Sequence, residues 1–255
     1  MDSSIIMLSF LISATLSCSL ALSACPKLEL LRTCTTLSRG FYATSSERER
    51  VNAQIDALVE SGSGLEDPTM GLAGSKSAAD ADSDDDAAAA SDVPLEGLWA
   101  LVYTDAFDVV SLASSPFTAL RGIYFEIDRK GTSSNIIDFA PRLEANLPSS
   151  INLGSTLRAR VKTKSKARSS TRVGLSFVGV SLEPQSLLGF DIRFAPPIGV
   201  DFPSLPSLGF GADSREDNGD NSPGFYDIMY LDDNLLILSQ NEPGGVFIST
   251  KVKDS

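Results

Sequence analysis

The sequence predicts a mainly β protein, an antiparallel barrel or sandwich preceded by one short helix. From residue 95 onward, about eight or nine short segments have the composition or the apolar–polar alternation of strands, with little helix between them. Turn-forming residues separate these segments, as in the stretch Gln240-Asn241-Glu242-Pro243-Gly244. Residues 46–60 alone have clear helical spacing.

Residues 1–24 have the features of a signal peptide. The segment is mostly apolar, and Ala21-Leu22-Ser23 fits the small-x-small pattern that signal peptidase cleaves. The start of the segment is unusual because it carries Asp2 and no basic residue. An uncleaved membrane anchor is an alternative, and Leu22-Ser23-Ala24-Cys25 also resembles a bacterial lipoprotein cleavage box.

Residues 25–45 have the composition of a transit peptide. The segment contains three basic residues, Lys27, Arg32 and Arg39, and only one acidic residue, Glu29, and it is rich in hydroxyl side chains. A signal followed by such a segment suggests a two-step address to a plastid reached through the secretory pathway. A secretory signal followed by a disordered spacer is the alternative, and we expect the mature chain to begin between Gly40 and Arg50.

The helix predicted over 46–60 is amphipathic. Its start fits a capping box formed by Ser46 and Glu49, and glycines follow its end. Its apolar face consists of Val51, Ile55, Leu58 and Val59. Residues 61–92 are rich in Asp, Gly and Ala, a composition that predicts an acidic disordered linker.

The β domain is predicted over 93–255. Residues 98–103 are expected to place Trp99, Leu101 and Tyr103 on one face, and 122–128 alternate strictly, with Phe125 on the apolar side. The many Pro, Gly and acidic residues over 195–224 predict a long loop. The other predicted strands are 135–139, 157–168, 172–182, 189–194, 225–231, 235–239 and 245–251.

Composition excludes several kinds of chemistry. The chain has no histidine, so it contains no Ser-His-Asp triad, no Cys-His pair and no His-ligated metal site. Its cysteines are Cys18, Cys25 and Cys34, all near the N-terminus. The net charge of -12 argues against nucleic acid as a partner. We therefore expect no catalytic residues, no metal and no cofactor.

Basic residues occupy every second position over 158–168, and on a strand they would all lie on one face. Such a row suits contact with anionic lipid head groups, each basic residue near a charged membrane contributing up to ~1 kcal/mol. A solvated outer face, a charged edge strand that resists aggregation, or contact with the acidic linker are the alternatives. The residues are Arg158, Arg160, Lys162, Lys164, Lys166 and Arg168.

Three segments resemble the plastid lipid-associated (fibrillin) family. They are 95–104 (Leu-Glu-Gly-Leu-Trp-Ala-Leu-Val-Tyr-Thr), 230–237 (Tyr-Leu-Asp-Asp-Asn-Leu-Leu-Ile) and 245–248 (Gly-Val-Phe-Ile). The resemblance covers residues 46–255, and the helix at 46–60 lies where the family has one. It departs at Leu236, where the family has arginine, and at Ser239-Gln240, where the family has Arg-Gly.

The resemblance implies a lipocalin-like barrel and a non-enzymatic role in binding or organising lipophiles at thylakoids or plastoglobules. The implied partners are plastid lipids or isoprenoid lipophiles, with peripheral membrane contact and a protein of lipid metabolism as further partners. The rival functions are an isomerase or cyclase acting inside the barrel, and an adaptor for a lipid-synthesis enzyme. The candidate lipid-binding residues are Trp99, Tyr103, Phe125, Phe177 and Tyr230, although Trp99 suits a core position equally well.

Overall fold

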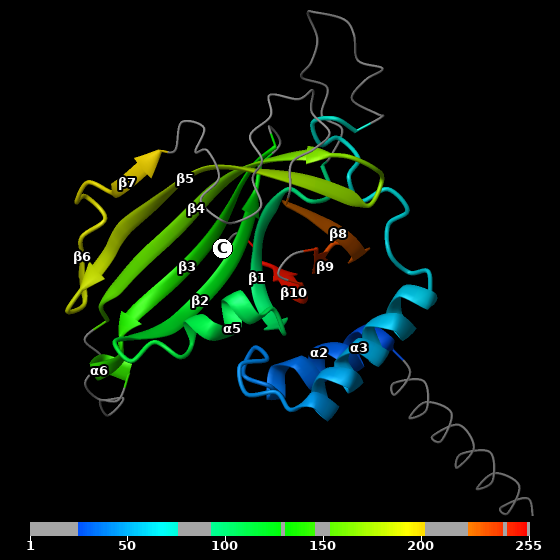
Figure 1. Cartoon of the computed structure of the whole chain (residues 1–255), viewed down its shortest axis with the longest axis horizontal. Coiled ribbons are helices and arrows are strands. Elements are labelled where there is room, and N and C mark those ends of the chain that lie inside the picture. The colour runs from blue at the N-terminus through cyan, green and yellow to red at the C-terminus, as the bar shows by residue number, and fades with distance from the viewer. Residues whose placement is uncertain are drawn as a thin grey trace, which may run out of the picture.

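A computed structural model describes residues 25–75, 93–128, 131–145, 154–201, 224–241 and 244–253 (Figure 1). The predicted signal peptide, residues 1–24, lies outside these ranges. The helices are α2 (Pro26–Thr36), α3 (Ser45–Glu60), α5 (Phe107–Leu112) and α6 (Arg142–Ala145). The strands are β1 (Gly97–Thr104), β2 (Thr118–Ile127), β3 (Thr132–Pro141), β4 (Thr156–Ala167), β5 (Arg172–Leu187), β6 (Phe190–Asp191), β7 (Ile198–Asp201), β8 (Gly224–Leu231), β9 (Leu235–Gln240) and β10 (Gly245–Lys251).

Eight strands close into an antiparallel barrel, which confirms the predicted fold class and excludes the sandwich. The order around the barrel is β1-β2-β3-β4-β5-β8-β9-β10, and β10 pairs again with β1. Strands β6 and β7 pair with β5 outside this ring. The predicted strands all exist, but the expected loop over 195–224 contains β7, and residues 202–223 lie outside the described residues.

The barrel is closed along only part of its length. Strands β1 and β2 pair over 97–100 and 124–127, and then diverge. On the other side, β8 pairs with the first four residues of β5, 172–175, while the rest of that long strand pairs with β4, β6 and β7. One end is therefore closed, and β2 to β7 flare away at the other end (Figure 1).

Several register shifts interrupt the pairing of the described strands, and they change which face a side chain occupies. The register between β1 and β10 shifts between Leu101 and Tyr103, so Tyr103 pairs with Ile248 on the outer side of the barrel. The expectation that Trp99, Leu101 and Tyr103 share one face is therefore wrong. A second shift lies near Phe177 in β5, opposite Lys162 and Thr163 of β4.

Helices α2 and α3 pack against the outside of β1, β8, β9 and β10, where they cover an apolar outer surface (Figure 1). The predicted helix at 46–60 is α3, but its capping box is Thr44 and Glu47, not Ser46 and Glu49. Thr44 N–H donates to Glu47 Oε2 at 2.8 Å, and Glu47 N–H donates to Thr44 Oγ1 at 3.4 Å. The residues of this outer core are Leu30, Cys34, Leu37, Val51, Ile55, Leu58, Tyr103, Tyr230, Leu235, Ile237 and Ile248.

Helix α2 lies within the segment that composition assigned to a transit peptide. Leu30 and Cys34 are fully buried against α3 and the barrel. Lys27 Nζ forms an ion pair with Asp232, at 2.6 Å from Oδ2, which ties the start of the helix to the β8–β9 turn. Residues 25–45 are thus part of the folded unit.

The expected acidic linker over 61–92 does not hold for residues 61–75. Leu72 is fully buried in the barrel core, and its neighbours hydrogen-bond to the wall. The main-chain N–H of Leu65 donates to Leu231 O at 2.9 Å, and that of Ala167 donates to Ala73 O at 2.8 Å. The segment therefore covers the closed end, while residues 76–92 lie outside the described residues.

Candidate functional site

The closed end of the barrel is filled by side chains. Trp99 is fully buried there, and its indole N–H donates to Leu95 O at 3.0 Å, so its polar atom is satisfied. Tyr226 makes edge-to-face contacts with Phe125 and Phe247, each with ring centroids 6.2 Å apart. The buried members of this core are Leu72, Val93, Leu95, Trp99, Ile127, Ala167, Val173, Leu175, Ile228, Leu231, Leu236 and Leu238.

Polar atoms inside the barrel satisfy one another. The hydroxyl of Ser133 lies 2.6 Å from both the Thr163 and Ser165 hydroxyls. Burial raises the pKa of Tyr226. By register, no inner-facing residue of the described strands is Asp or Glu. The inner faces of the described strands thus offer no carboxylate for acid–base catalysis, although the Asp108 carboxylate of α5 lies close enough to Tyr226 to raise its pKa further.

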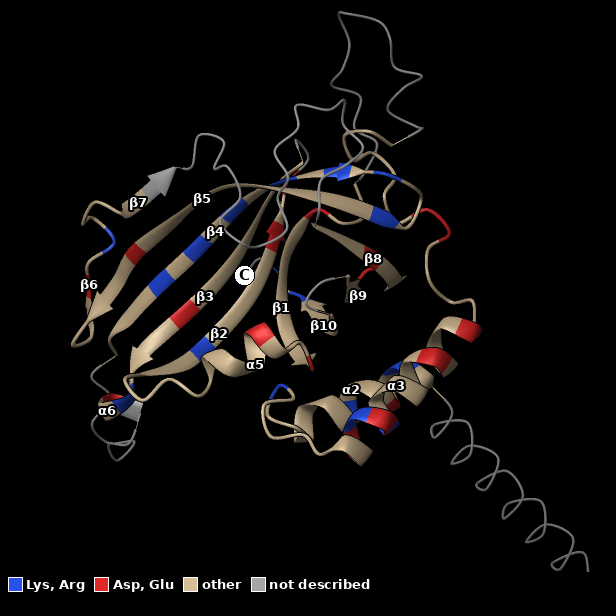
Figure 2. Cartoon of the chain, in the orientation of Figure 1, with Lys and Arg blue, Asp and Glu red and all other residues tan. Residues whose placement is uncertain are grey.

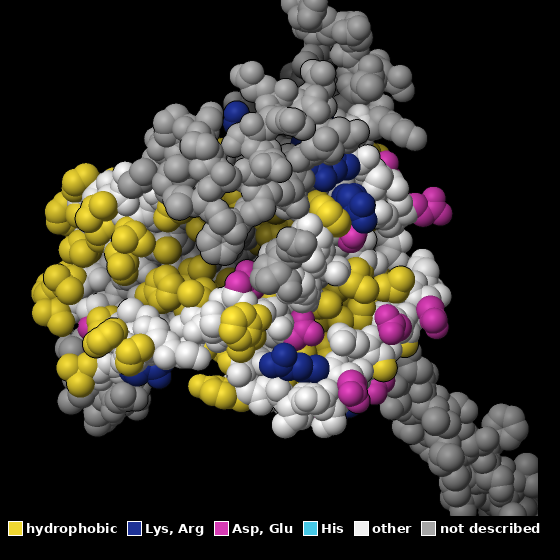
Figure 3. All heavy atoms as spheres, viewed as in Figure 1, with side chains coloured by type: hydrophobic (Ala, Val, Ile, Leu, Met, Phe, Trp, Pro, Cys, Tyr) yellow, Lys and Arg dark blue, Asp and Glu magenta, His cyan; other side chains and the backbone are white. Residues whose placement is uncertain are grey.

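The inner face at the flared end is apolar and open to solvent. Val180 and Leu182 of β5 extend the inner surface that Val173 and Leu175 begin at the closed end, but both are exposed. Ile198 of β7 pairs with Leu182 and continues the same surface. In Figure 3, hydrophobic side chains gather over this part of the molecule. The exposed apolar residues of this inner surface are Leu157, Phe177, Val180, Leu182 and Ile198.

The rim of the flared end carries further exposed apolar side chains. Leu188 and Gly189 form the tight turn between β5 and β6, both with positive φ, at 50° and 84°. A bulky residue rarely adopts this conformation, which here places Leu188 at the tip of the turn. The rim residues, none of which the sequence reasoning selected, are Phe107, Phe117, Leu143, Leu187, Leu188, Phe190 and Phe194.

The five predicted lipid-binding residues do not form one group. Trp99 and Phe125 lie in the core of the closed end, where Phe125 is partly buried. Tyr103 and Tyr230 lie outside the barrel wall under the helices. Phe177 alone reaches the flared end, with 70% of its surface exposed. Alternation identified the strands, but the bulge near Tyr103 and the extent of barrel closure leave no signal in one sequence.

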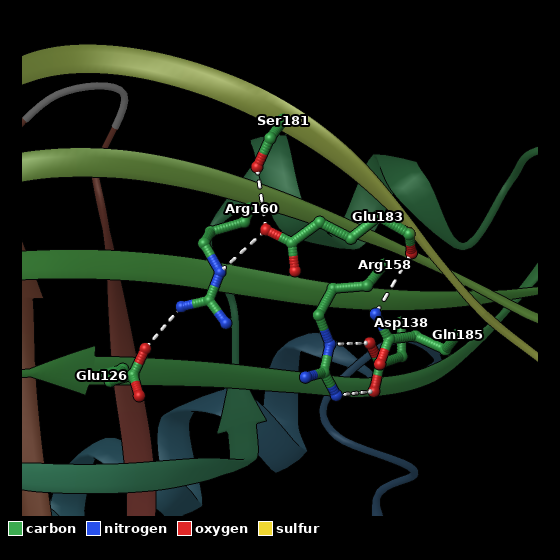
Figure 4. Close-up of polar contacts among 7 residues, drawn as sticks. All are labelled: Glu126, Asp138, Arg158, Arg160, Ser181, Glu183 and Gln185. Atoms are coloured by element: carbon green, nitrogen blue, oxygen red, sulfur yellow. Dashed lines mark hydrogen bonds and ion pairs between the residues drawn. The ribbon is translucent and has the colours of Figure 1, made fainter. Parts of the chain in front are cut away.

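The row of basic residues on β4 lies on the outer face, and acidic neighbours neutralise part of it (Figures 2 and 4). Arg158 forms two hydrogen bonds with the Asp138 carboxylate, at 2.8 and 2.9 Å. This pairing raises the pKa of the Arg158 guanidinium. Arg160 forms ion pairs with Glu126, at 2.5 Å, and Glu183, at 3.2 Å.

The rest of the row lies toward the closed end. Lys162, Lys164 and Lys166 are exposed, and no ion pair to them is found among the described residues. The Arg168 guanidinium lies 6.0 Å from the centre of the Phe225 ring. The exposed positive charge of β4 is therefore concentrated in the three lysines.

In the described part of the chain, no group of three or more His, Cys, Asp or Glu side chains is arranged to hold a metal ion. No helix described in the structure has the length and apolar character needed to cross a bilayer.

Comparison with known proteins identifies the family. The PAP_fibrillin family model matches residues 84–249, which covers most of the barrel. The chain belongs to the PAP_fibrillin family. No curated protein and no solved structure matches it. Membership implies a plastid protein that associates with lipids and has a structural role.

One departure from the family motif lies in the core at the closed end of the barrel. Leu236 occupies the position where the motif given in the sequence analysis has arginine, and it is fully buried inside the barrel. The leucine keeps this position apolar, in agreement with an interior built by packing.

Proposed function

We propose that the chain is a non-enzymatic binding protein that holds a plastid lipophile, such as a quinone, carotenoid or fatty acid, on the inner face of its flared end. One observation carries this proposal. The inner surface that is filled at the closed end continues as exposed Val180, Leu182 and Ile198 at the flared end. Exposed apolar surfaces of this kind typically mark ligand or membrane contacts.

Covering the apolar inner face of the flared end with a ligand would contribute considerable binding free energy. Full burial of an aliphatic or aromatic side chain contributes about 1.5–3 kcal/mol. A ligand that covers several of the exposed residues would therefore gain enough to offset the cost of immobilising it. The absence of inner-facing carboxylates on the described strands favours binding over an isomerase or cyclase reaction.

The rim supports contact with a lipid surface, as at a thylakoid or plastoglobule. Leu188 and Phe190 lie at the tip of the β5–β6 turn, and Phe190 is 74% exposed. Apolar side chains at such a tip can enter the boundary between head groups and acyl chains without spanning the membrane. A lipophile would then reach the inner face directly from the lipid phase.

Lipid extraction with mass spectrometry tests this proposal. Leu182→Asn should reduce the lipophile that co-purifies with the full chain, because it places an amide on the inner face. Leu28→Asn is the matched control, since Leu28 is exposed on α2, away from the barrel interior. Equal recovery of lipid from the parent and from both variants would contradict the proposal.

An adaptor function is the second candidate, because the same rim would suit a protein partner. Phe190→Ser separates the two. Loss of vesicle binding would support contact with lipid. If vesicle binding is unchanged and a lipid-synthesis enzyme no longer co-purifies with the variant, the rim serves an adaptor.

A further inference from the structure

A second apolar groove lies on the other side of the barrel, where β1 and β2 diverge. It has a volume of about 550 Å³, within the range of small-molecule sites. The 37–42 loop and the segments beside α5 border it (Figure 1). Its lining residues are Cys34, Thr35, Ser38, Arg39, Phe41, Tyr42, Leu101, Val102, Ala113, Ala119, Leu120 and Arg142.

Arg39 links the two diverging strands. Its main-chain oxygen accepts a hydrogen bond from Thr104 N at 3.1 Å, on β1. Its guanidinium Nη2 donates to Arg121 O at 2.8 Å, on β2. The remaining guanidinium donors have no partner among the described residues, so the side chain has free hydrogen-bonding capacity at the groove.

The loop that carries Arg39 is held in a strained conformation. Ser38, Arg39 and Gly40 have φ values of 48°, 61° and 85°. A non-glycine residue rarely adopts the left-handed region, because its Cβ crowds the neighbouring backbone. Gly40 is required, because a Cβ there would lie 2.0 Å from Thr104 O. Strain of this kind persists where surrounding contacts enforce it, and it concentrates at ligand sites.

The charge of the groove is opposite to that of the chain. Arg39 and Arg142 line it, and none of its lining residues is Asp or Glu. Arg142 donates to the main-chain oxygens of Ala113, Ser115 and Thr118, and no described carboxylate pairs with either arginine. An apolar groove with two guanidinium groups therefore lies on a chain of net charge -12.

We propose that this groove binds a long-chain carboxylate, a fatty acid whose head group lies at Arg39 and whose tail follows Val102, Leu120 and Leu101. A guanidinium forms paired hydrogen bonds with a carboxylate, which an uncharged head group of the same chain length does not reproduce. Leu101 and Leu120 face inward by register, so the tail points into the barrel. The head-group end of this site, at Arg39, lies outside the inner face of the flared end, which the tail reaches at Leu120, because Leu120 pairs with Phe139 and Phe139 with Leu157.

Calorimetric titration of the full chain with dodecanoic acid and with 1-dodecanol tests the head-group specificity. The parent should bind the acid at least tenfold more tightly than the alcohol, since the carboxylate forms an ion pair with two charge-assisted hydrogen bonds to the guanidinium, whereas the neutral hydroxyl offers a single hydrogen bond. Arg39→Gln should remove this difference. Arg32→Gln is the matched control, because Arg32 is exposed on α2 and does not line the groove. Equal binding of acid and alcohol by the parent would overturn the proposal.

Crosslinking of the parent locates the site even if Arg39→Gln fails to fold. Dodecanoic acid with a diazirine next to its carboxylate should label peptides containing residues 34–42, 101–102 or 113–120. Labelling confined to residues 177–198 would overturn the groove while supporting the proposed function at the flared end. Labelling of the groove together with normal lipid recovery by Leu182→Asn would support the groove and contradict the flared site.

Discussion

The closed and flared ends of this barrel are built from the same strands but present different surfaces. At the closed end, inner-facing Trp99 and Val173 are buried in a continuous core. At the flared end, inner-facing Val180 and Leu182 belong to the same strand as Val173 and are exposed. The apolar pattern is alike at both ends, so the difference arises from strand pairing.

Strand pairing determines whether an inner face becomes a core or a surface. Two short strand pairings, which we call the seams, close the barrel, and each involves four residues of each strand. They join β1 (97–100) to β2 (124–127) and β5 (172–175) to β8 (224–227). Where the walls meet, side chains from opposite strands fill the space between them, as in other small barrels. Beyond the seams the strands lack an opposite wall, and their apolar side chains stay available to a ligand.

Trp99→Ala, at the closed end, should cause the largest loss of unfolding free energy among these variants. Removing a buried Trp side chain costs about 3–5 kcal/mol of unfolding free energy, because the surrounding core closes only partly around the cavity. Urea unfolding of the parent and the variant measures this change. Leu182→Asn at the flared end should leave the unfolding midpoint nearly unchanged.

The two variants together decide whether the ends differ as described. A Trp99→Ala protein of normal stability that no longer retains lipid would place the ligand at the closed end. A strongly destabilised Leu182→Asn protein would mean that the flared inner face is part of the core.

Most strands of both ends were predictable from sequence, but β7 and the contrast between the ends were not. Alternation over 122–128 identified the apolar face of Phe125, which the register places inside the barrel beside Trp99. A strand has the same apolar–polar alternation whether or not other strands pack over its inner face. The sequence therefore carries no signal that Val180 is exposed. The bulge that moves Tyr103 to the outer side also depends on its partner strand.

Leu30→Ala should cause the next largest loss of stability. It should lower the unfolding free energy by about 2–5 kcal/mol, because the Leu30 side chain is fully buried between α2 and the barrel. Urea unfolding measures it. If residues 25–45 acted only as a targeting segment, the substitution would leave stability unchanged. Mass spectrometry of the native protein adds a separate test, since a mature chain beginning before Pro26 would retain this packing and one beginning after Gly40 would lose it.

This segment combines the composition of a transit peptide with the spacing of a packed helix. Basic and hydroxyl residues over 25–45 fit a transit peptide, while Leu30, Cys34 and Leu37 at spacings of four and three define an apolar helical face. Likewise, the row of cations on β4 was visible in sequence, but its partners Asp138 and Glu126 come from strands whose register was unknown. Local patterns identify elements, and tertiary contacts decide their roles.

Alkaline pH should weaken the helical layer. Burial raises the pKa of the Cys34 thiol from 9.0 to about 12. Above pH 9 the thiol ionises in the unfolded chain but not in the folded one, so stability falls as pH rises toward 12. The loss should be on the order of 1 kcal/mol by pH 10. Tyr103, with its pKa raised to about 12, acts in the same direction from about pH 10.

Urea unfolding at pH 8, 9 and 10 measures this dependence. Cys34→Ala should show a shallower fall in unfolding free energy between pH 9 and 10 than the parent, whatever its stability at pH 8. Identical slopes for the two proteins would show that the thiol is accessible to water, and that α2 does not pack as described.

Substitution of the β4 lysines should have the smallest effect on stability, because all three side chains are exposed. Lys162, Lys164 and Lys166 replaced together by Gln should change the unfolding free energy by about 0.5 kcal/mol or less at each position. Binding to anionic vesicles should weaken if these lysines contact lipid head groups. The parent should also lose binding as salt rises, since the Debye length is about 8 Å at physiological ionic strength.

Flotation with anionic and neutral vesicles, at low and high salt, separates this contact from the apolar rim. The lysines lie on the half of β4 nearer the closed end and the rim lies at the flared end, so the two contacts can be changed separately. Lys253→Gln controls for the loss of an exposed charge elsewhere. Salt-sensitive binding lost only in the triple variant would assign the membrane contact to β4. Salt-insensitive binding lost only in Phe190→Ser would assign it to the rim, and the lysines would then serve to keep the outer face of the sheet soluble.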